Sequence, residues 1–193
     1  MEERAGLQIL LFGDQLSWSQ WLGEHYAQIE GVWLKLAKKN GGASTVSYAE
    51  ALDEALCYGW IDGQVGRYDE QYYLQRFTPR RSRSVWSKTN TEKAEQLCQT
   101  GRMHPAGWSA IETAKANGRW EAAYAPSSTM TLPPDFQTAL DAHPQAQTFF
   151  QSLNKLNRYA FYYRIQSAPN PKIRTQKIEK FITMLTEGKK FHP

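Results

Sequence analysis

The sequence predicts an α+β fold, in which a small antiparallel sheet packs with helices and an all-helical tail follows. Three observations lead to this fold class. Segments rich in aromatic and β-branched residues are interspersed with segments of helical periodicity up to about residue 123. A linker-like stretch, YAPSSTMT at 124–131, then interrupts the pattern. Beyond Pro133 and Pro134 only helical periodicity recurs.

The first elements are an apolar segment, a helix and a strand. Residues 7–12 (LQILLF) predict an extended segment or first strand. Ser17 is the expected N-cap of a helix whose Trp18 and Trp21 share one face. Residues 32–36 (VWLKL) alternate apolar and polar side chains in their second half, which predicts a half-buried strand.

A capped helix and a hairpin follow. Ser47 and Glu50 are spaced as a capping box, and Gly59 is the expected C′ residue of the helix that they begin. Residues 60–68 and 71–77 are rich in aromatic or branched side chains and are separated by a turn, so they predict two hairpin strands.

The remaining elements are helical. A helix is expected at about 90–100, with Asn90 as its N-cap, and another at about 105–117. The expected domains are an α+β body at 1–123 and a helical C-terminal region at 132–193 that packs on it. The four helices of that region are expected at about 134–141, 144–154, 157–168 and 172–187.

Composition indicates a folded protein of the cytoplasm. A chain of 193 residues with 41% hydrophobic residues can bury a sizeable core. The formal net charge of +4 is compatible with an anionic partner but does not require one. Cys57 and Cys98 lack CxxC partners, which indicates reduced thiols. The apolar stretch at 7–13 is too short for a membrane span and lacks the features of a secretory signal.

Several kinds of chemistry lack support in the sequence. No GxSxG, Walker A, GxGxxG or HExxH pattern is present. The sequence therefore gives no support for a serine nucleophile, a P-loop, a dinucleotide site or a zinc protease. The histidines have no ligand partners at metal spacing, so neither a metal nor a cofactor is expected. These are His25, His104, His143 and His192.

The strongest candidate site is a basic stretch at 76–90 that contains no acidic residue. Guanidinium groups match phosphate or carboxylate oxygens in pairs, and an aromatic ring beside them suits a stacked base. In the alternative, the arginines pair with acids and the tryptophan fills the core; both interpretations stay open. The expected ligand-binding residues of this stretch are Arg76, Arg80, Arg81, Arg83, Trp86, Ser87 and Lys88.

A second candidate is Asp62, which follows Trp60 and lies between two glycines. Placed across the hairpin, Asp62 would face Arg76 or Arg80, and both Asp62 and Trp60 are expected to belong to the same ligand-binding site. A general base needs a pKa raised toward neutrality, whereas a neighbouring arginine keeps a carboxyl ionised. We therefore favour a structural role for Asp62 and assign no catalytic residue.

Longer segments carry a resemblance to a known family. GWIDG at 59–63 is followed by FTPRRSRSVWS at 77–87, and PPDFQTALDAHPQAQTFF at 133–150 by RTQKIEKFITML at 174–185. Together these resemble the bacteriocin-protection, YdeI or OmpD-associated family over nearly the whole chain. The resemblance implies protection against bacteriocins or envelope stress, and association with an outer-membrane porin. It also implies a compact α+β body like that of the YdhG, YjbR and CyaY-like proteins, and supplies no catalytic residues.

Three functions remain in competition. The first is a non-enzymatic protein that binds nucleic acid or a phosphorylated small molecule at the basic stretch. The second is a protein that binds a protein partner through its helical tail. The third is an enzyme of unknown class in which Asp62, His104 and the arginines share one pocket.

Overall fold

The computed structural model describes residues 2–27, 30–126, 128–129 and 131–193. The chain divides into two compact units that are not continuous in sequence. The N-terminal unit comprises the residues up to Ser84 together with Asn90–Trp120, and the C-terminal unit comprises Val85–Thr89 and Glu121–Pro193. Each unit is described by itself.

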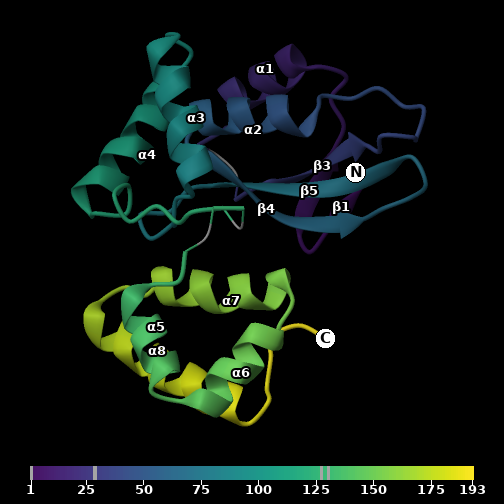
Figure 1. The fold of residues 1–193 in the computed structure, drawn as a ribbon. Coiled ribbons are helices and arrows are strands. Elements are labelled where there is room, and N and C mark those ends of the chain that lie inside the picture. Colours follow the sequence, from purple (N-terminus) through teal and green to yellow (C-terminus); the bar gives the residue numbers. More distant parts are fainter. Residues whose placement is uncertain (1, 28–29, 127, 130) are drawn as a thin grey trace. The chain divides into compact units, whose positions relative to one another are not determined.

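The N-terminal unit contains a five-stranded sheet in the order β1-β2-β3-β5-β4, which confirms the α+β class (Figure 1). One pair, β2 with β3, is parallel, whereas an antiparallel sheet was predicted. The helix α1 connects these two strands, and a helical crossover is what permits parallel pairing. The strands are β1 Glu3–Arg4, β2 Leu7–Leu10, β3 Val32–Ala37, β4 Trp60–Arg67 and β5 Tyr72–Pro79.

Strand β1 is absent from the sequence-based expectation. It is two residues long and joins β2 through Ala5 and Gly6, which both adopt positive φ, at 52° and 75°. Two-residue hairpin turns need this backbone conformation, but alanine rarely supplies it. The turn therefore carried no signal in the sequence.

Four helices accompany the sheet: α1 Gln15–His25, α2 Tyr48–Cys57, α3 Lys88–Gln99 and α4 Pro105–Ala116. Figure 1 shows α1 and α2 along one face of the sheet. The capping box of α2 is confirmed, and Gly59 has a φ of 73° at its C-terminal end. The N-cap of α1 is Asp14 and not Ser17, because an Asp14 carboxylate oxygen accepts the Ser17 backbone N–H at 2.8 Å.

Helix α3 begins at Lys88, two residues before the predicted N-cap Asn90. The preceding residues pair with another segment of the C-terminal unit: Ser87 forms a parallel bridge with Tyr124, and Lys88 N–H donates to Tyr124 O at 2.9 Å. This pairing orders the chain up to the first helical residue. Asn90 is buried within the helix and does not cap it.

Aromatic residues form the core between the sheet and α1. Trp18 packs against Trp60 and Phe77, with ring centroids 6.4 Å and 5.8 Å away. The indole N–H of Trp18 donates to Ala51 O at 3.1 Å, and that of Trp60 donates to Tyr26 O at 3.1 Å. Both buried indoles therefore keep a hydrogen-bond partner, as burial of a polar group requires.

The C-terminal unit confirms the predicted helical region. Its helices are α5 Pro134–Asp141, α6 Pro144–Ser152, α7 Lys155–Gln166 and α8 Pro171–Thr186. Phe136, Phe150 and Phe161 lie at the centre of its apolar core. Asn157 is buried, and its amide oxygen accepts the backbone N–H groups of Phe191 and His192, which fastens the chain end to α7.

Candidate anion-binding site

A cleft of about 580 Å³ opens beside the β4–β5 hairpin in the N-terminal unit. A volume of this order is typical of small-molecule sites. Polar and basic side chains from β4, β5 and the following loop line it, together with one acid from the segment that precedes β3. The lining residues are Glu30, Gly63, Gln64, Arg76, Thr78, Pro79, Arg81 and Ser84.

A bulge in β4 shapes the floor of the cleft. The register between β4 and β5 shifts between Asp62 and Val65, so Gly63 and Gln64 have no regular ladder partners. A Cβ added at Gly63 would lie 3.8 Å from the Cβ of Arg76 and 3.9 Å from its Cδ. The absent side chain of Gly63 therefore leaves the aliphatic part of Arg76 uncovered at the bulge.

Arg76 and Arg81 are the two cations of the cleft. Arg76 is half-buried in β5, and within the part of the chain that the structure describes its buried Nε has no hydrogen-bond partner. Arg81 is exposed and lies in a turn in which its N–H donates to Ser84 Oγ at 2.9 Å. The ion pairs between described residues include neither arginine.

A further cation lies on the same face of the sheet as Arg76. Trp33 is the cross-strand neighbour of Arg76, and the guanidinium carbon of Arg4 lies 5.0 Å from the centroid of the Trp33 ring. The Arg4 guanidinium also donates to Arg67 O at 2.9 Å, across the surface that Gly66 leaves open. Arg4 and Arg76 therefore lie on one face of the sheet, where the neighbouring Lys35 is paired with Glu2 at 2.7 Å.

The other basic residues of the predicted site lie apart from the cleft lining. Arg83 is exposed, and Arg80 is half-buried with its backbone N–H bonded to Gly59 O at 2.9 Å. Ser87 and Lys88 belong to the C-terminal unit. Of the expected basic cluster, the structure thus brings Arg76 and Arg81 together in one cleft.

The two tryptophans of the predicted site are buried, Trp60 with 1% and Trp86 with 3% of its surface exposed. A ring buried to this degree has no free face on which a base can stack. The expectation that an aromatic ring accompanies the arginines at the surface is therefore not met by either residue.

Asp62 does not face Arg76. Its ladder partner is Phe77, the neighbour of Arg76 in β5, and successive side chains of a strand point to opposite faces. The Asp62 carboxylate accepts a hydrogen bond from the Tyr48 hydroxyl at 2.8 Å. Asp62 is therefore held at the start of α2, and the described lining of the arginine cleft does not include it.

Glu30, Gln64 and Thr78 are cleft residues that sequence reasoning missed. Glu30 precedes Gly31, whose φ is 140° and whose added Cβ would lie 2.6 Å from Phe77 O. This close backbone approach brings Glu30 beside β5. A glycine directly before a predicted strand was the single local signal for it.

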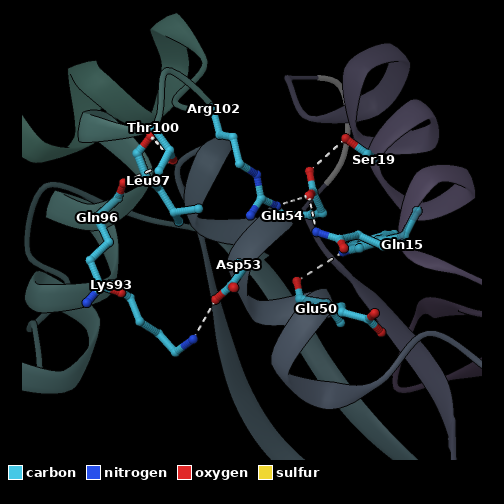
Figure 2. A network of polar contacts seen from close by, with 12 residues as sticks. Gln15, Ser19, Glu50, Asp53, Glu54, Lys93, Gln96, Leu97, Thr100 and Arg102 are labelled. Atoms are coloured by element: carbon cyan, nitrogen blue, oxygen red, sulfur yellow. Dashed lines mark hydrogen bonds and ion pairs between the residues drawn. The ribbon is translucent and has the colours of Figure 1, made fainter.

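A polar network of the N-terminal unit surrounds Glu54 of α2, which is 8% exposed (Figure 2). Its carboxylate accepts hydrogen bonds from Gln15 at 2.6 Å, Ser19 at 2.7 Å and Arg102 at 2.5 Å. These donors come from α1 and from the segment between α3 and α4. Three hydrogen bonds satisfy the buried charge and join the helices, so we assign the network a structural role.

His104, considered at the sequence level as a base, caps α4. Its Nδ1 accepts the Ala106 N–H at 3.3 Å, and its ring stacks on Tyr58 with centroids 4.7 Å apart. Among the described residues, no group of three or more His, Cys, Asp or Glu side chains is placed to hold a metal ion. No described helix is both long and apolar enough to cross a membrane.

Comparison with known families divides the chain in two. The family model for Domain of unknown function (DUF8412) matches residues 10–110. The model for Bacteriocin-protection, YdeI or OmpD-Associated matches residues 129–188. No curated protein and no solved structure matches the chain. The resemblance drawn from the sequence is thus found in the C-terminal helices, whereas the arginine cleft lies within the segment of unknown function.

Proposed function

We propose that this chain, which belongs to the family described as Domain of unknown function (DUF8412) and ends in a YdeI or OmpD-associated segment, binds a small anionic ligand between Arg76 and Arg81. The binding is non-enzymatic, and it serves the protective role that the name of the C-terminal family expresses.

A single observation carries the proposal: Arg76 and Arg81 line one cleft, and the ion pairs between described residues include neither of them. A half-buried cation with an unsatisfied N–H is unfavourable unless a partner arrives. Phosphate or carboxylate oxygens match the planar guanidinium donors, and Thr78 and Ser84 line the same cleft.

The proposal also assigns the protein to the cytoplasm. Cys57 and Cys98 are both free thiols, and Cys57 is buried. Reduced cysteines of this kind are usual in a reducing compartment. An anionic metabolite or nucleotide would be available there as a ligand.

Isothermal titration calorimetry with inorganic phosphate at two salt concentrations tests this function. We expect saturable binding that weakens with salt, and a loss of roughly tenfold to a hundredfold in affinity for Arg81→Ala, because a hydrogen bond to a charged group is removed. Arg83→Ala is the matched control, since Arg83 is also exposed and lies outside the cleft lining.

Equal affinity of Arg81→Ala and Arg83→Ala would exclude the cleft as the binding site. Absence of saturable binding by the wild-type protein would reject the function. Arg76→Gln provides a second variant, and its circular dichroism spectrum and melting temperature separate a loss of binding from a loss of folding.

A second candidate function, binding of an apolar segment of a protein partner, is favoured by a groove in the C-terminal unit. The groove has a volume of about 440 Å³ and is lined mainly by α6 and α8, with Phe149 and Leu185 among its residues. Affinity capture should recover a partner with the wild type and with Thr183→Asp, which lies outside the groove, but not with Phe149→Asp. Recovery of the same partner by all three proteins would reject the groove.

A further inference from the structure

Glu30 places a carboxylate in the same cleft as the two arginines. It is exposed, and the ion pairs between described residues include no partner for it. An ionised carboxylate accepts hydrogen bonds and donates none, and it repels a phosphate at close range. Free inorganic phosphate therefore satisfies the arginines but not Glu30.

A ligand with two unlike ends satisfies both parts of the cleft. Its anionic end would bind Arg76 and Arg81, and hydrogen-bond donors at its other end would bind the Glu30 carboxylate. Neighbouring sugar hydroxyls are donors of this kind, since the two oxygens of a carboxylate accept one hydrogen bond from each. The side-chain amide of Gln64 lines the same cleft and both donates and accepts.

The residues that line the cleft also favour a small molecule over a nucleic acid strand as the ligand. Single strands are held by aromatic platforms together with a positive groove. The residues described as lining the cleft include no aromatic side chain, and both Trp60 and Trp86 are buried. A volume of about 580 Å³ accommodates a sugar phosphate.

Deepening the function proposed above, on which this step rests, we infer that the ligand is a small sugar phosphomonoester. Its phosphate lies between Arg76 and Arg81, and its hydroxyls donate to Glu30. Glu30 is then a specificity-determining residue that selects a phosphate ester of a polyhydroxy compound over free phosphate.

Calorimetric titration with ribose 5-phosphate, inorganic phosphate and ribose tests this inference. The wild type should bind ribose 5-phosphate about tenfold more tightly than phosphate, because each charge-assisted hydrogen bond adds affinity. Glu30→Gln should change the affinities for the two ligands in opposite directions. Phosphate should bind more tightly, because the repulsion by the carboxylate is removed, and ribose 5-phosphate should bind more weakly, because its hydroxyls lose their acceptor. Glu70→Gln, at the distant turn of the hairpin, changes the net charge equally and should leave both affinities as they are.

The outcomes distinguish this inference from the function on which it rests. Phosphate binding that depends on Arg81, with an affinity ratio that Glu30→Gln leaves unchanged, overturns the role of Glu30 and keeps the anion site. Lack of binding by every probe overturns both. Tighter binding of a single-stranded oligonucleotide than of ribose 5-phosphate, lost in Arg81→Ala, replaces the small ligand with a nucleic acid strand.

Discussion

Arg174 binds Asp135 through two hydrogen bonds, from Nε to Oδ2 at 2.6 Å and from Nη2 to Oδ1 at 2.9 Å. The pair joins the first turn of α8 to the first turn of α5. The remaining terminal nitrogen of Arg174 donates to Ile165 O at 3.2 Å near the end of α7. One guanidinium therefore connects three of the four C-terminal helices, and its planar geometry explains how a single side chain can do so.

This pair predicts an acid-dependent stability of the C-terminal unit. Hydrogen bonding to Arg174 lowers the pKa of Asp135 below its ordinary value. The stabilisation is therefore present above the ordinary carboxyl pKa near 4 and is lost as the pH falls through the lowered folded-state value, because the unfolded chain takes up the proton first.

Asp135→Asn should lower the free energy of unfolding at pH 7 by about 1 kcal/mol, since the pair is partly exposed to solvent. Urea titrations between pH 7 and pH 2.5 should show a smaller acid dependence in the variant than in the wild type. If the free energy of unfolding depended on pH in the same way in both proteins, the pair would contribute nothing to the acid transition.

Glu54 and Asp53, neighbours on α2, should differ sharply in their effect on stability. Glu54 is buried with three donors, whereas Asp53 forms one partly exposed ion pair with Lys93 at 2.6 Å. Glu54→Ala should cost about 2 kcal/mol, because the half-buried donors Gln15 and Ser19 lose their acceptor, and Asp53→Ala about 1 kcal/mol or less. Chemical denaturation of both variants measures the difference, and equal losses would remove the structural role assigned to the network in Figure 2.

At Gly107, a change from glycine to alanine should have the opposite effect on stability from the one usual in a helix. Alanine ordinarily stabilises a helix interior by roughly 1 kcal/mol relative to glycine. A Cβ at Gly107 would lie within 2.3 Å of Cys57 O and of the Met103 sulfur, so α4 would have to move away from the end of α2. Gly107→Ala should therefore destabilise the N-terminal unit by about 2 kcal/mol or more.

The control for this variant is Gly23→Ala in α1, where the added Cβ would meet the Tyr58 hydroxyl oxygen at 3.3 Å, so that a shift of a few tenths of an ångström relieves the contact. We expect a neutral or raised melting temperature for Gly23→Ala and a lowered one for Gly107→Ala in thermal denaturation. A stabilising effect of Gly107→Ala would show that the two helices do not approach this closely.

Cys57 predicts a loss of stability at alkaline pH. Burial, with the nearby Glu54 charge, raises the pKa of Cys57 to about 12. A raised folded-state pKa gives stability that is complete below the ordinary thiol pKa near 9 and is lost as the pH rises toward the folded value. The stability difference between wild type and Cys57→Ala should therefore fall by up to about 1.4 kcal/mol per pH unit above pH 9.

The same burial predicts slow modification of the Cys57 thiol. Ellman's reagent at pH 8 should react with the native Cys98→Ala variant far more slowly than with the unfolded variant, because the thiolate is scarce and covered. Rapid reaction of the native variant would show that Cys57 is accessible to reagents.

Local signals were sufficient for most helices and strands. Ser47 and Glu50 are three residues apart, and Gly59 follows the helix that they begin, so spacing alone located α2. The same reasoning misplaced the cap of α1, because Asp14 and Ser17 are both good caps and only the hydrogen bond between them decides the choice.

The candidate site was harder to predict because its geometry is non-local. Whether Asp62 or Gly63 lies beside Arg76 depends on the hairpin register, and a shift of one residue moves a side chain to the other face of the sheet. Glu30 reaches the cleft only because Gly31 approaches β5 closely. The sequence does identify Arg76 and Arg81 as candidates, since both lie in a basic stretch without acids.

The short segment 85–89 decides how this protein can be divided. It belongs to the C-terminal unit, although the chain on both sides of it belongs to the N-terminal unit. The polypeptide therefore passes from one unit to the other three times, and no single cut yields two intact pieces. A fragment that ends before Glu121 would carry Trp86 without Tyr124, the residue whose backbone pairs with it.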